Sequence, residues 1–162
     1  LPQNAKVLIP GFAFAAVPSA VIHANYTPVL CEVGENYRID MADFAAKLPG
    51  VDAVIISHMR GHTSDMDAIM QLCDAANVPV IEDAAHSLGT LWHDRKIGTI
   101  GKIGCFSFQS YKMVNARVGR ISCRFITCVS TTCQRCWCGP NWPNCPAVWP
   151  TGCATTTMSR PS

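Results

Sequence analysis

Acidic residues are missing from the C-terminal part of this 162-residue chain. All eleven Asp and Glu residues lie at or before Asp94, and the only charged residues after Arg120 are Arg124, Arg135 and Arg160. Seven of the ten Cys and three of the four Trp also lie after Arg120. This uneven distribution indicates that two different kinds of sequence are joined in one chain.

Three further absences exclude whole classes of protein. A formal net charge of +2 is too small to indicate a nucleic-acid partner or an anionic membrane surface. No apolar run reaches the roughly 18 residues that a membrane span needs. The start, Leu1-Pro2-Gln3, lacks an initiating Met and a basic stretch followed by an apolar one, so we expect no signal peptide and a chain cut from a longer protein. The composition, 49% hydrophobic and 15% charged, is typical of one globular domain.

Short apolar runs alternate with helical patterns in the first 115 residues. Buried strands are predicted at residues 27–33, 52–58 and 78–83, and a half-buried strand at 105–112. Helices are predicted to start at Asp40 and Ser64, each followed three residues later by an acid, and to end before Gly50 and Pro79. Apolar strands separated by helices predict an α/β fold, a mostly parallel sheet with helices on both faces.

Polar side chains follow three of the predicted strands, namely His58, Asp83 and Lys112. Parallel sheets bind ligands beyond the carboxyl ends of their strands, so these groups are candidates for one site. Asp83 either caps a following helix or pairs with a cationic nitrogen of a ligand. Lys112 is either an exposed surface amine or a desolvated amine whose lowered pKa lets it attack a carbonyl.

Two further residues have similar alternatives. Ser107 is either the polar face of a strand or a hydroxyl donor to a phosphate. Phe14 is either a core residue or a platform on which a ligand ring stacks. Neither residue is specific by itself.

Three stretches together are specific: "IPGFAFAAVPSAV", "GHTSDMDAIMQLCDAANVPVIEDAAHSLGT" and "GTIGKIGCFSFQSYKMVNA". In order and spacing they resemble the DegT/DnrJ/EryC1/StrS family of sugar aminotransferases, which are pyridoxal-phosphate enzymes of the aspartate-aminotransferase fold (fold type I). The resemblance runs from about residue 5 to residue 116. It implies a partial large domain, residues 1–116, that binds pyridoxal 5'-phosphate.

The resemblance also implies a role for five residues. Lys112 would hold the cofactor as an internal aldimine, and Ser107 would bind its phosphate. Asp83 would pair with the pyridinium nitrogen, His86 would lie near the phenolic oxygen, and Phe14 would stack on the ring. Some family members have His at the lysine position and act as sugar dehydratases, so Lys112 favours transamination.

The implied reaction moves an amino group from an amino acid, such as glutamate or glutamine, to a keto-sugar that is linked to a nucleotide. We expect a cytoplasmic protein, and the resemblance implies a homodimer with sites completed by both chains, although this chain lacks much of that interface. We therefore keep the alternative of a truncated, non-catalytic family fragment.

The tail, residues 117–162, departs from the family and has no clear helical or strand period. Its composition suggests a GC-rich gene translated out of frame, or a disordered segment. The competing interpretation is a small zinc or disulfide module, because Cys133-x-x-Cys136 has ligand-like spacing, but one such pair is weak evidence and we predict no metal site. Cys31, Cys73 and Cys105 lie in apolar segments and are expected to be buried thiols of a cytosolic protein.

Overall fold

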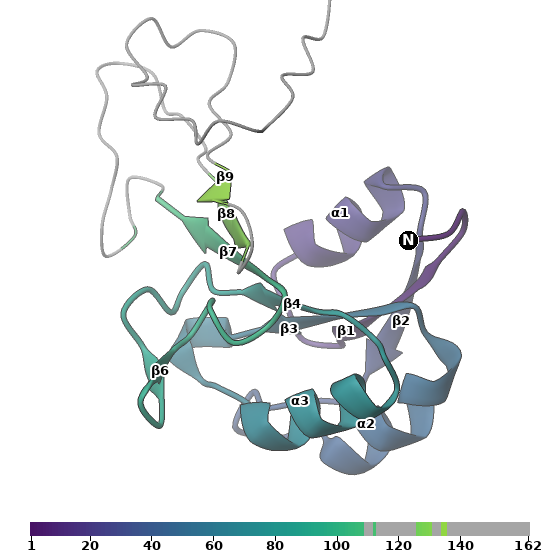
Figure 1. The fold of residues 1–162 in the computed structure, drawn as a ribbon, viewed down its shortest axis with the longest axis horizontal. Helices are drawn as coiled ribbons and strands as arrows, with labels where there is room; N and C mark the ends of the chain where they lie inside the picture. The colour runs from purple at the N-terminus through teal and green to yellow at the C-terminus, as the bar shows by residue number, and fades with distance from the viewer. Residues whose placement is uncertain (109–111, 113–125, 131–133, 136–162) are drawn as a thin grey trace, which may run out of the picture.

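The computed structural model describes residues 1–108, 112, 126–130 and 134–135, the last two segments by their backbone alone. A seven-stranded sheet forms the centre of this described part, in the order β2-β1-β3-β4-β7-β8-β9 (Figure 1). The strands of this sheet are β1 (Lys6–Pro10), β2 (Thr27–Cys31), β3 (Ala53–Ser57), β4 (Val80–Asp83), β7 (Ile103–Ser107), β8 (Ile126–Ser130) and β9 (Gln134–Arg135). The connections contain α1 (Ala16–His23), α2 (Met41–Lys47), α3 (Met66–Ala75), the 3-10 turns η1 (Leu48–Gly50) and η2 (Met59–Gly61), and a hairpin of β5 (Leu91–Trp92) and β6 (Arg95–Lys96).

Five neighbouring strands of the sheet are parallel, namely β2, β1, β3, β4 and β7. Helices cover both faces of the sheet. Figure 1 shows α1 on one face and both α2 and α3 on the other. Side chains alternate between the faces along each strand, so β1 contributes Val7 and Ile9 to the α1 side and Leu8 to the opposite side. The larger core, on the α2 and α3 side, includes Leu8, Val54, Ile56, Val80, Phe44, Met66, Ile69 and Cys73. The predicted α/β architecture is confirmed.

The two predicted helix starts have different outcomes. Asp40 caps α2, because its carboxylate accepts hydrogen bonds from the backbone N–H groups of Ala42 and Asp43, as predicted. The predicted cap at Ser64 is wrong. Asp65 caps α3 instead, since the Ser64 hydroxyl is buried and accepts a hydrogen bond from the N–H of Ile39.

The strand boundaries also differ from the prediction. The predicted strand 27–33 ends at Cys31 and forms the sheet edge, where Leu30 is 58% exposed rather than buried. The predicted strand 105–112 begins earlier, at Ile103, and ends at Ser107; residues 109–111 lie outside the described part. In the tail, where no strand was predicted, the backbone of β8 pairs antiparallel with β7. The Cys133-x-x-Cys136 pair lies outside the described residues.

The cysteines of the described core are largely inaccessible. Cys31 and Cys73 are buried, and Cys105 is half-buried. Burial is the main cause that raises the pKa of the Cys31 thiol to about 12 and that of Cys73 to about 11, so both remain protonated at neutral pH.

Within the described part of the chain, none of the helices has the length and apolar character that crossing a membrane requires.

The turn before β7 packs directly on that strand, and this packing requires glycine. Gly98 has a φ of +87°, in the left-handed region, and a Cβ there would overlap the ring of Phe106. A Cβ at Gly104, on β7 itself, would overlap the carbonyl group of Gly98. The two glycines therefore allow the turn and the strand to touch backbone to backbone.

We predict that Gly98→Ala lowers the free energy of unfolding by about 2–4 kcal/mol, because the new methyl group meets Phe106 and the backbone is strained. Urea unfolding followed by circular dichroism measures the change. Gly50→Ala is the matched control, since a Cβ at Gly50 meets no atom within 4 Å, and it should be close to neutral. Equal stabilities of the two variants would contradict this account of the turn.

Candidate functional site

The carboxyl ends of the parallel strands lie side by side at one end of the sheet. We refer to this end, and not to the outermost strand, as the edge that carries the site. Phe14 follows β1, and Ser57, Asp83 and Ser107 are the last residues of β3, β4 and β7. Ser57 pairs in register with Asp83, and Asp83 with Cys105, so Ser107 lies two residues beyond that level. From β1 the chain goes to β2 on one side of β1 and then crosses to β3 on the other side of β1. The point between β1 and β3 is therefore a topological switch point, where such sheets bind ligands.

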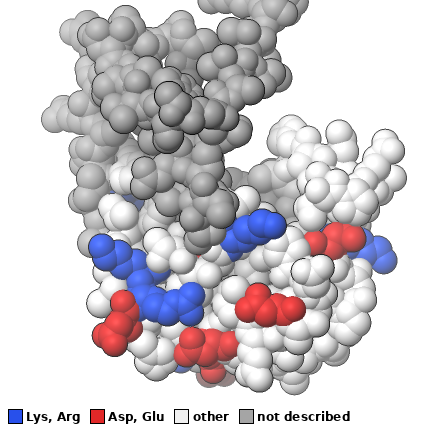
Figure 2. Space-filling view, viewed as in Figure 1, with Lys and Arg blue, Asp and Glu red and all other residues white. Residues whose placement is uncertain are grey.

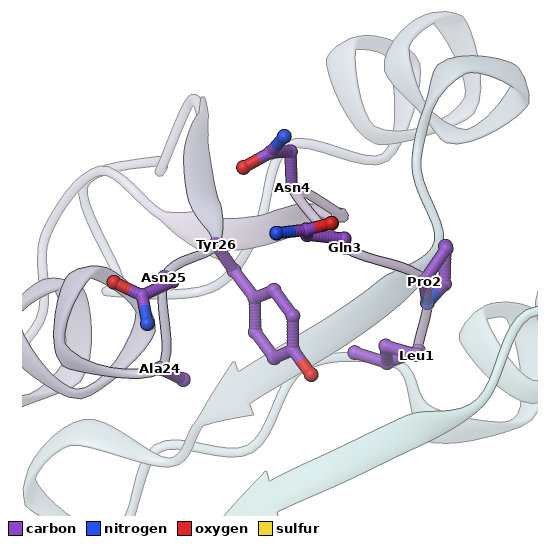
Figure 3. A pocket seen from close by; sticks show the side chains of 7 residues that line it. All are labelled: Leu1, Pro2, Gln3, Asn4, Ala24, Asn25 and Tyr26. Carbon is purple, nitrogen blue, oxygen red and sulfur yellow. The ribbon is translucent and has the colours of Figure 1, made fainter.

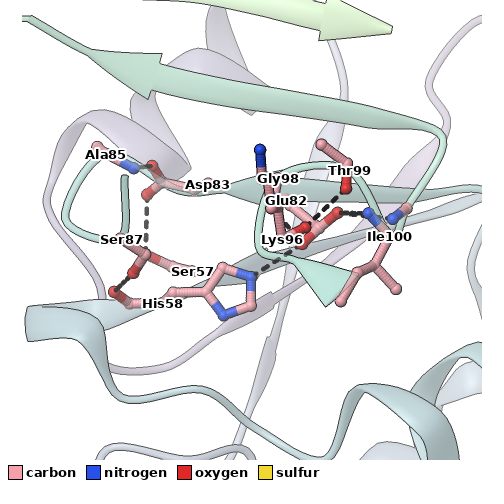
Figure 4. A network of polar contacts seen from close by, with 11 residues as sticks. Ser57, His58, Glu82, Asp83, Ala85, Ser87, Lys96, Gly98, Thr99 and Ile100 are labelled. Atoms are coloured by element: carbon pink, nitrogen blue, oxygen red, sulfur yellow. Dashed lines mark hydrogen bonds and ion pairs between the residues drawn. The ribbon is translucent and has the colours of Figure 1, made fainter. Parts of the chain in front are cut away.

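Asp83 is held by two hydrogen bonds (Figure 4). The Ser57 hydroxyl donates to Asp83 Oδ2 at 2.8 Å, and the N–H of Ala85 donates to Oδ1 at 3.2 Å. The carboxylate is half-buried and fixed in orientation, and each oxygen retains a lone pair for another donor. The alternative of a helix cap is wrong, because a turn follows β4 and the next element is the strand β5.

Lys112 and His86 belong to the electrostatic neighbourhood of Asp83. Burial lowers the pKa of the half-buried Lys112 amine, and the Asp83 carboxylate partly opposes this effect. Burial also lowers the pKa of His86, the positive charges of Lys112 and Arg60 lower it further, and Asp83 acts in the opposite direction. The three groups thus influence one another's pKa and form one electrostatic neighbourhood.

Phe14 is accessible from solvent. Its side chain is 63% exposed, although its backbone is tied to α1 through a hydrogen bond from the N–H of Val17 to its carbonyl oxygen. The alternative of a core residue is therefore wrong for Phe14. Ser107 is half-buried at the end of β7.

His58 does not join this group, contrary to the sequence prediction. The residue after Ser57 points to the opposite face of the sheet, where the His58 side chain is fully buried. Its Nε2 lies 3.3 Å from Oε2 of Glu82 (Figure 4). His58 is therefore part of the core beneath the edge.

Glu82 is a buried carboxylate that the sequence analysis did not single out. Its Oε1 accepts hydrogen bonds from the N–H groups of Ile100 (2.7 Å) and Gly101 (2.6 Å), and its Oε2 accepts one from Gly98 (2.8 Å). Burial raises the pKa of Glu82, but the contact with His58 and the backbone donors outweigh burial, so the net pKa is lowered. An acid inside an apolar strand, followed by a glycine-rich turn, was the signal that could have revealed it.

We predict that Glu82→Gln lowers the free energy of unfolding at pH 7 by about 2–4 kcal/mol, because an amide cannot accept all three hydrogen bonds. The folded-state pKa is lowered, so the contribution of the ionised group is present above the unfolded pKa, about 4.3, and is lost as pH falls through the folded pKa. Urea unfolding from pH 3 to pH 7 should therefore give a shallower decline in the variant than in the unmodified chain.

The exposed Glu35 provides the control, and Glu35→Gln should change neither the stability at pH 7 nor its decline in acid. A Glu82→Gln chain with unchanged stability would mean that the three donors find other partners.

A surface hollow lies away from these residues. It is lined by Leu1, Pro2, Gln3, Asn4, Ala24, Asn25 and Tyr26 (Figure 3). These residues precede β1, or lie between α1 and β2, so the hollow is at the amino end of the sheet. It contains none of the predicted site residues.

The fold is similar to that of solved aminotransferases. A solved aminotransferase from Psychrobacter cryohalolentis is 34% identical and superposes with a TM-score of 0.66 over 70% of this chain and 29% of its own. The model of the DegT/DnrJ/EryC1/StrS aminotransferase family matches residues 1–119. The chain belongs to this family.

Two relatives match this chain at similar identity. One is the UDP-N-acetyl-3-dehydro-alpha-D-glucosamine 3-aminotransferase of Acidithiobacillus ferrooxidans, 35% identical over 113 residues, 68% of this chain and 31% of the relative. The other, from Bacillus subtilis, has a name that describes a pyridoxal phosphate-dependent aminotransferase; it is 35% identical over 125 residues, 72% of this chain and 32% of the relative. The chain thus spans about a third of the length of these relatives.

Proposed function

We propose that the chain is part of a pyridoxal-phosphate-dependent aminotransferase that moves an amino group from an amino acid to a keto-sugar. The observation that carries this proposal is the half-buried Lys112 amine, with a lowered pKa, in the electrostatic neighbourhood of Asp83. An amine that loses its proton more readily than an ordinary lysine is suited to attack a carbonyl carbon.

The residues at this edge fit the cofactor. Pyridoxal phosphate, when bound, withdraws electrons from the carbon atom that loses its proton. Asp83 offers an oriented carboxylate that would keep a ring nitrogen protonated through a charge-assisted hydrogen bond. The exposed ring of Phe14 offers a stacking surface, and the Ser107 hydroxyl would donate to the phosphate.

Two residues would handle protons and polar groups during the reaction. Lys112 would link covalently to the cofactor in the resting protein, and its Nζ, once released, would accept the substrate proton and return it. His86, whose lowered pKa favours a neutral ring, would contact the phenolic oxygen of the cofactor. Its Nδ1 is already oriented by the N–H of Arg60 at 3.5 Å.

The substrate class in this proposal comes from the relatives. The Acidithiobacillus protein is named for a nucleotide-linked keto-sugar, so a keto-sugar nucleotide is the proposed acceptor and glutamate or glutamine the proposed donor. A cytoplasmic homodimer, with each site completed by both chains, is the assembly that we propose for the whole enzyme.

We predict that borohydride reduction of the chain with pyridoxal phosphate labels Lys112, and that Lys112→Ala abolishes this label and the visible absorption band of the bound cofactor. Peptide mass mapping measures the label. Lys96→Ala, at an exposed lysine of the β5–β6 hairpin, is the control and should be labelled at Lys112 as before. A label that persists in the Lys112→Ala chain at equal yield would reject the assignment.

We predict that Asp83→Asn slows exchange of the α-proton of glutamate with solvent deuterium by about 100-fold or more, because a neutral amide does not hold a proton on the ring nitrogen. The covalent label at Lys112 should remain. Exchange is measured by proton NMR, and Asp94→Asn, at an exposed acid, should exchange at the unmodified rate. Full exchange in the Asp83→Asn chain would remove Asp83 from the proposed mechanism.

The second candidate is a non-catalytic member of the family. The same measurements separate the two candidates. A chain that is labelled at Lys112 but exchanges no proton supports the non-catalytic member, and a chain that does both supports the enzyme.

A further inference from the structure

Four ring and guanidinium side chains gather on the loops that follow β1, β2 and β3. We call Phe12, Tyr37, Arg60 and His62 the aromatic platform. The rings of Phe12 and Tyr37 are stacked, with centroids 5.1 Å apart and planes at 24°. The ring of His62 lies 5.5 Å from that of Tyr37, and Cζ of Arg60 lies 5.9 Å from the Tyr37 centroid. Residues far apart in the sequence thus form one continuous surface.

Part of the aromatic platform is open to solvent. Phe12 remains 48% exposed although it stacks on Tyr37, and both Arg60 and His62 are exposed. Among the described residues Arg60 makes no ion pair with a carboxylate. The turn that carries Tyr37 also holds the exposed Glu35 and Arg38, whose charges offset each other. Arg60 therefore gives the platform a positive character.

The backbone holds the platform in an uncommon conformation. Tyr37 and Arg60 have φ values of 61° and 53°, in the left-handed region that residues other than glycine seldom adopt. The Tyr37 turn is closed by hydrogen bonds from Gly34 N–H to the Arg38 carbonyl and from Tyr37 N–H to the Gly34 carbonyl. Backbone strain of this kind is found at binding sites, where the surrounding structure maintains it.

The platform borders the proposed cofactor site. The N–H of Arg60 faces Nδ1 of His86 at 3.5 Å, and Phe12 is two residues from Phe14 on the same loop. A ligand with one end at Lys112 could therefore reach the platform with its other end.

We propose that the aromatic platform binds the nucleoside diphosphate part of the substrate, an inference that rests on the proposed aminotransferase function. An exposed phenylalanine face binds planar bases by stacking, with little preference between them. An exposed guanidinium without a carboxylate partner matches the geometry and charge of a phosphate. A nucleoside diphosphate has both groups, and its attached sugar would extend toward Lys112.

The test is isothermal titration calorimetry of the full chain with UDP, and with uridine and pyrophosphate as partial ligands. Phe12→Ala should weaken UDP and uridine binding about tenfold and leave pyrophosphate binding unchanged. Arg60→Gln should weaken UDP and pyrophosphate binding to a similar degree, with little effect on uridine. The Arg60 effect should shrink at high salt, because screening weakens the contact in the unmodified chain.

The exposed residues Leu91 and Arg95 of the β5–β6 hairpin provide matched controls. Leu91→Ala and Arg95→Gln should bind all three ligands as the unmodified chain does. Circular dichroism and size-exclusion chromatography of each variant check the fold and the oligomeric state.

The outcomes separate this inference from the proposed function. A chain that labels at Lys112 but binds no UDP, or binds it equally well after both platform substitutions, overturns the inference and leaves the proposed function intact. Binding that both substitutions weaken, in a chain that takes no label, supports the platform and rejects the proposed function. A Phe12→Ala chain that changes only its oligomeric state shows that the platform is an interface between copies, and overturns the inference.

Discussion

The arrangement of β3, β4 and β7 at the carboxyl end of the sheet depends on the contacts of the buried Glu82 carboxylate. This carboxylate binds three backbone N–H groups of the turn before β7 and touches His58 at the end of β3 (Figure 4). A buried charge is tolerated only with such compensation, so the turn, β4 and the end of β3 must adopt this arrangement together. Glu82 therefore fixes the turn from which β7 begins.

The alternation of side chains along β4 separates structure from chemistry. Glu82 pairs in register with Ile56, a residue of the core on the α2 and α3 side, and so faces that side. Its neighbour Asp83 faces the opposite side, where Ser57 donates to it. An interaction that holds Glu82 thus also limits the movement of Asp83. On the described part of the face seen in Figure 2, Lys and Arg lie next to Asp and Glu, with no extended area of one sign. The charge with the most hydrogen-bond partners described here, the Glu82 carboxylate, lies inside the fold rather than on that face.

Much of the architecture could be predicted from the sequence, because local patterns carry it. The strands around residues 52–58 and 78–83 are continuous apolar runs, and Asp40 caps a helix through its own side chain. β1 was missed because it is a short run that ends in Pro10, and the two-residue strands of the β5–β6 hairpin carry too little pattern to detect. The spacing of Ser64 and Asp67 predicts a cap at Ser64, but the N–H of a distant residue, Ile39, donates to the serine hydroxyl and Asp65 caps the helix instead.

The sequence by itself determined the α/β class and the family, because the order and spacing of the motifs around Phe14, Asp83 and Lys112 survive without any knowledge of contacts. Only the tertiary structure decided which polar strand-end residues face the open edge. His58 and Asp83 look alike in sequence, each following an apolar strand, yet His58 is buried against Glu82 whereas Asp83 is held by Ser57. The physical reason is that the helices and turns covering a face of the sheet decide whether a side chain on that face is buried or accessible. These covering elements come from distant parts of the chain.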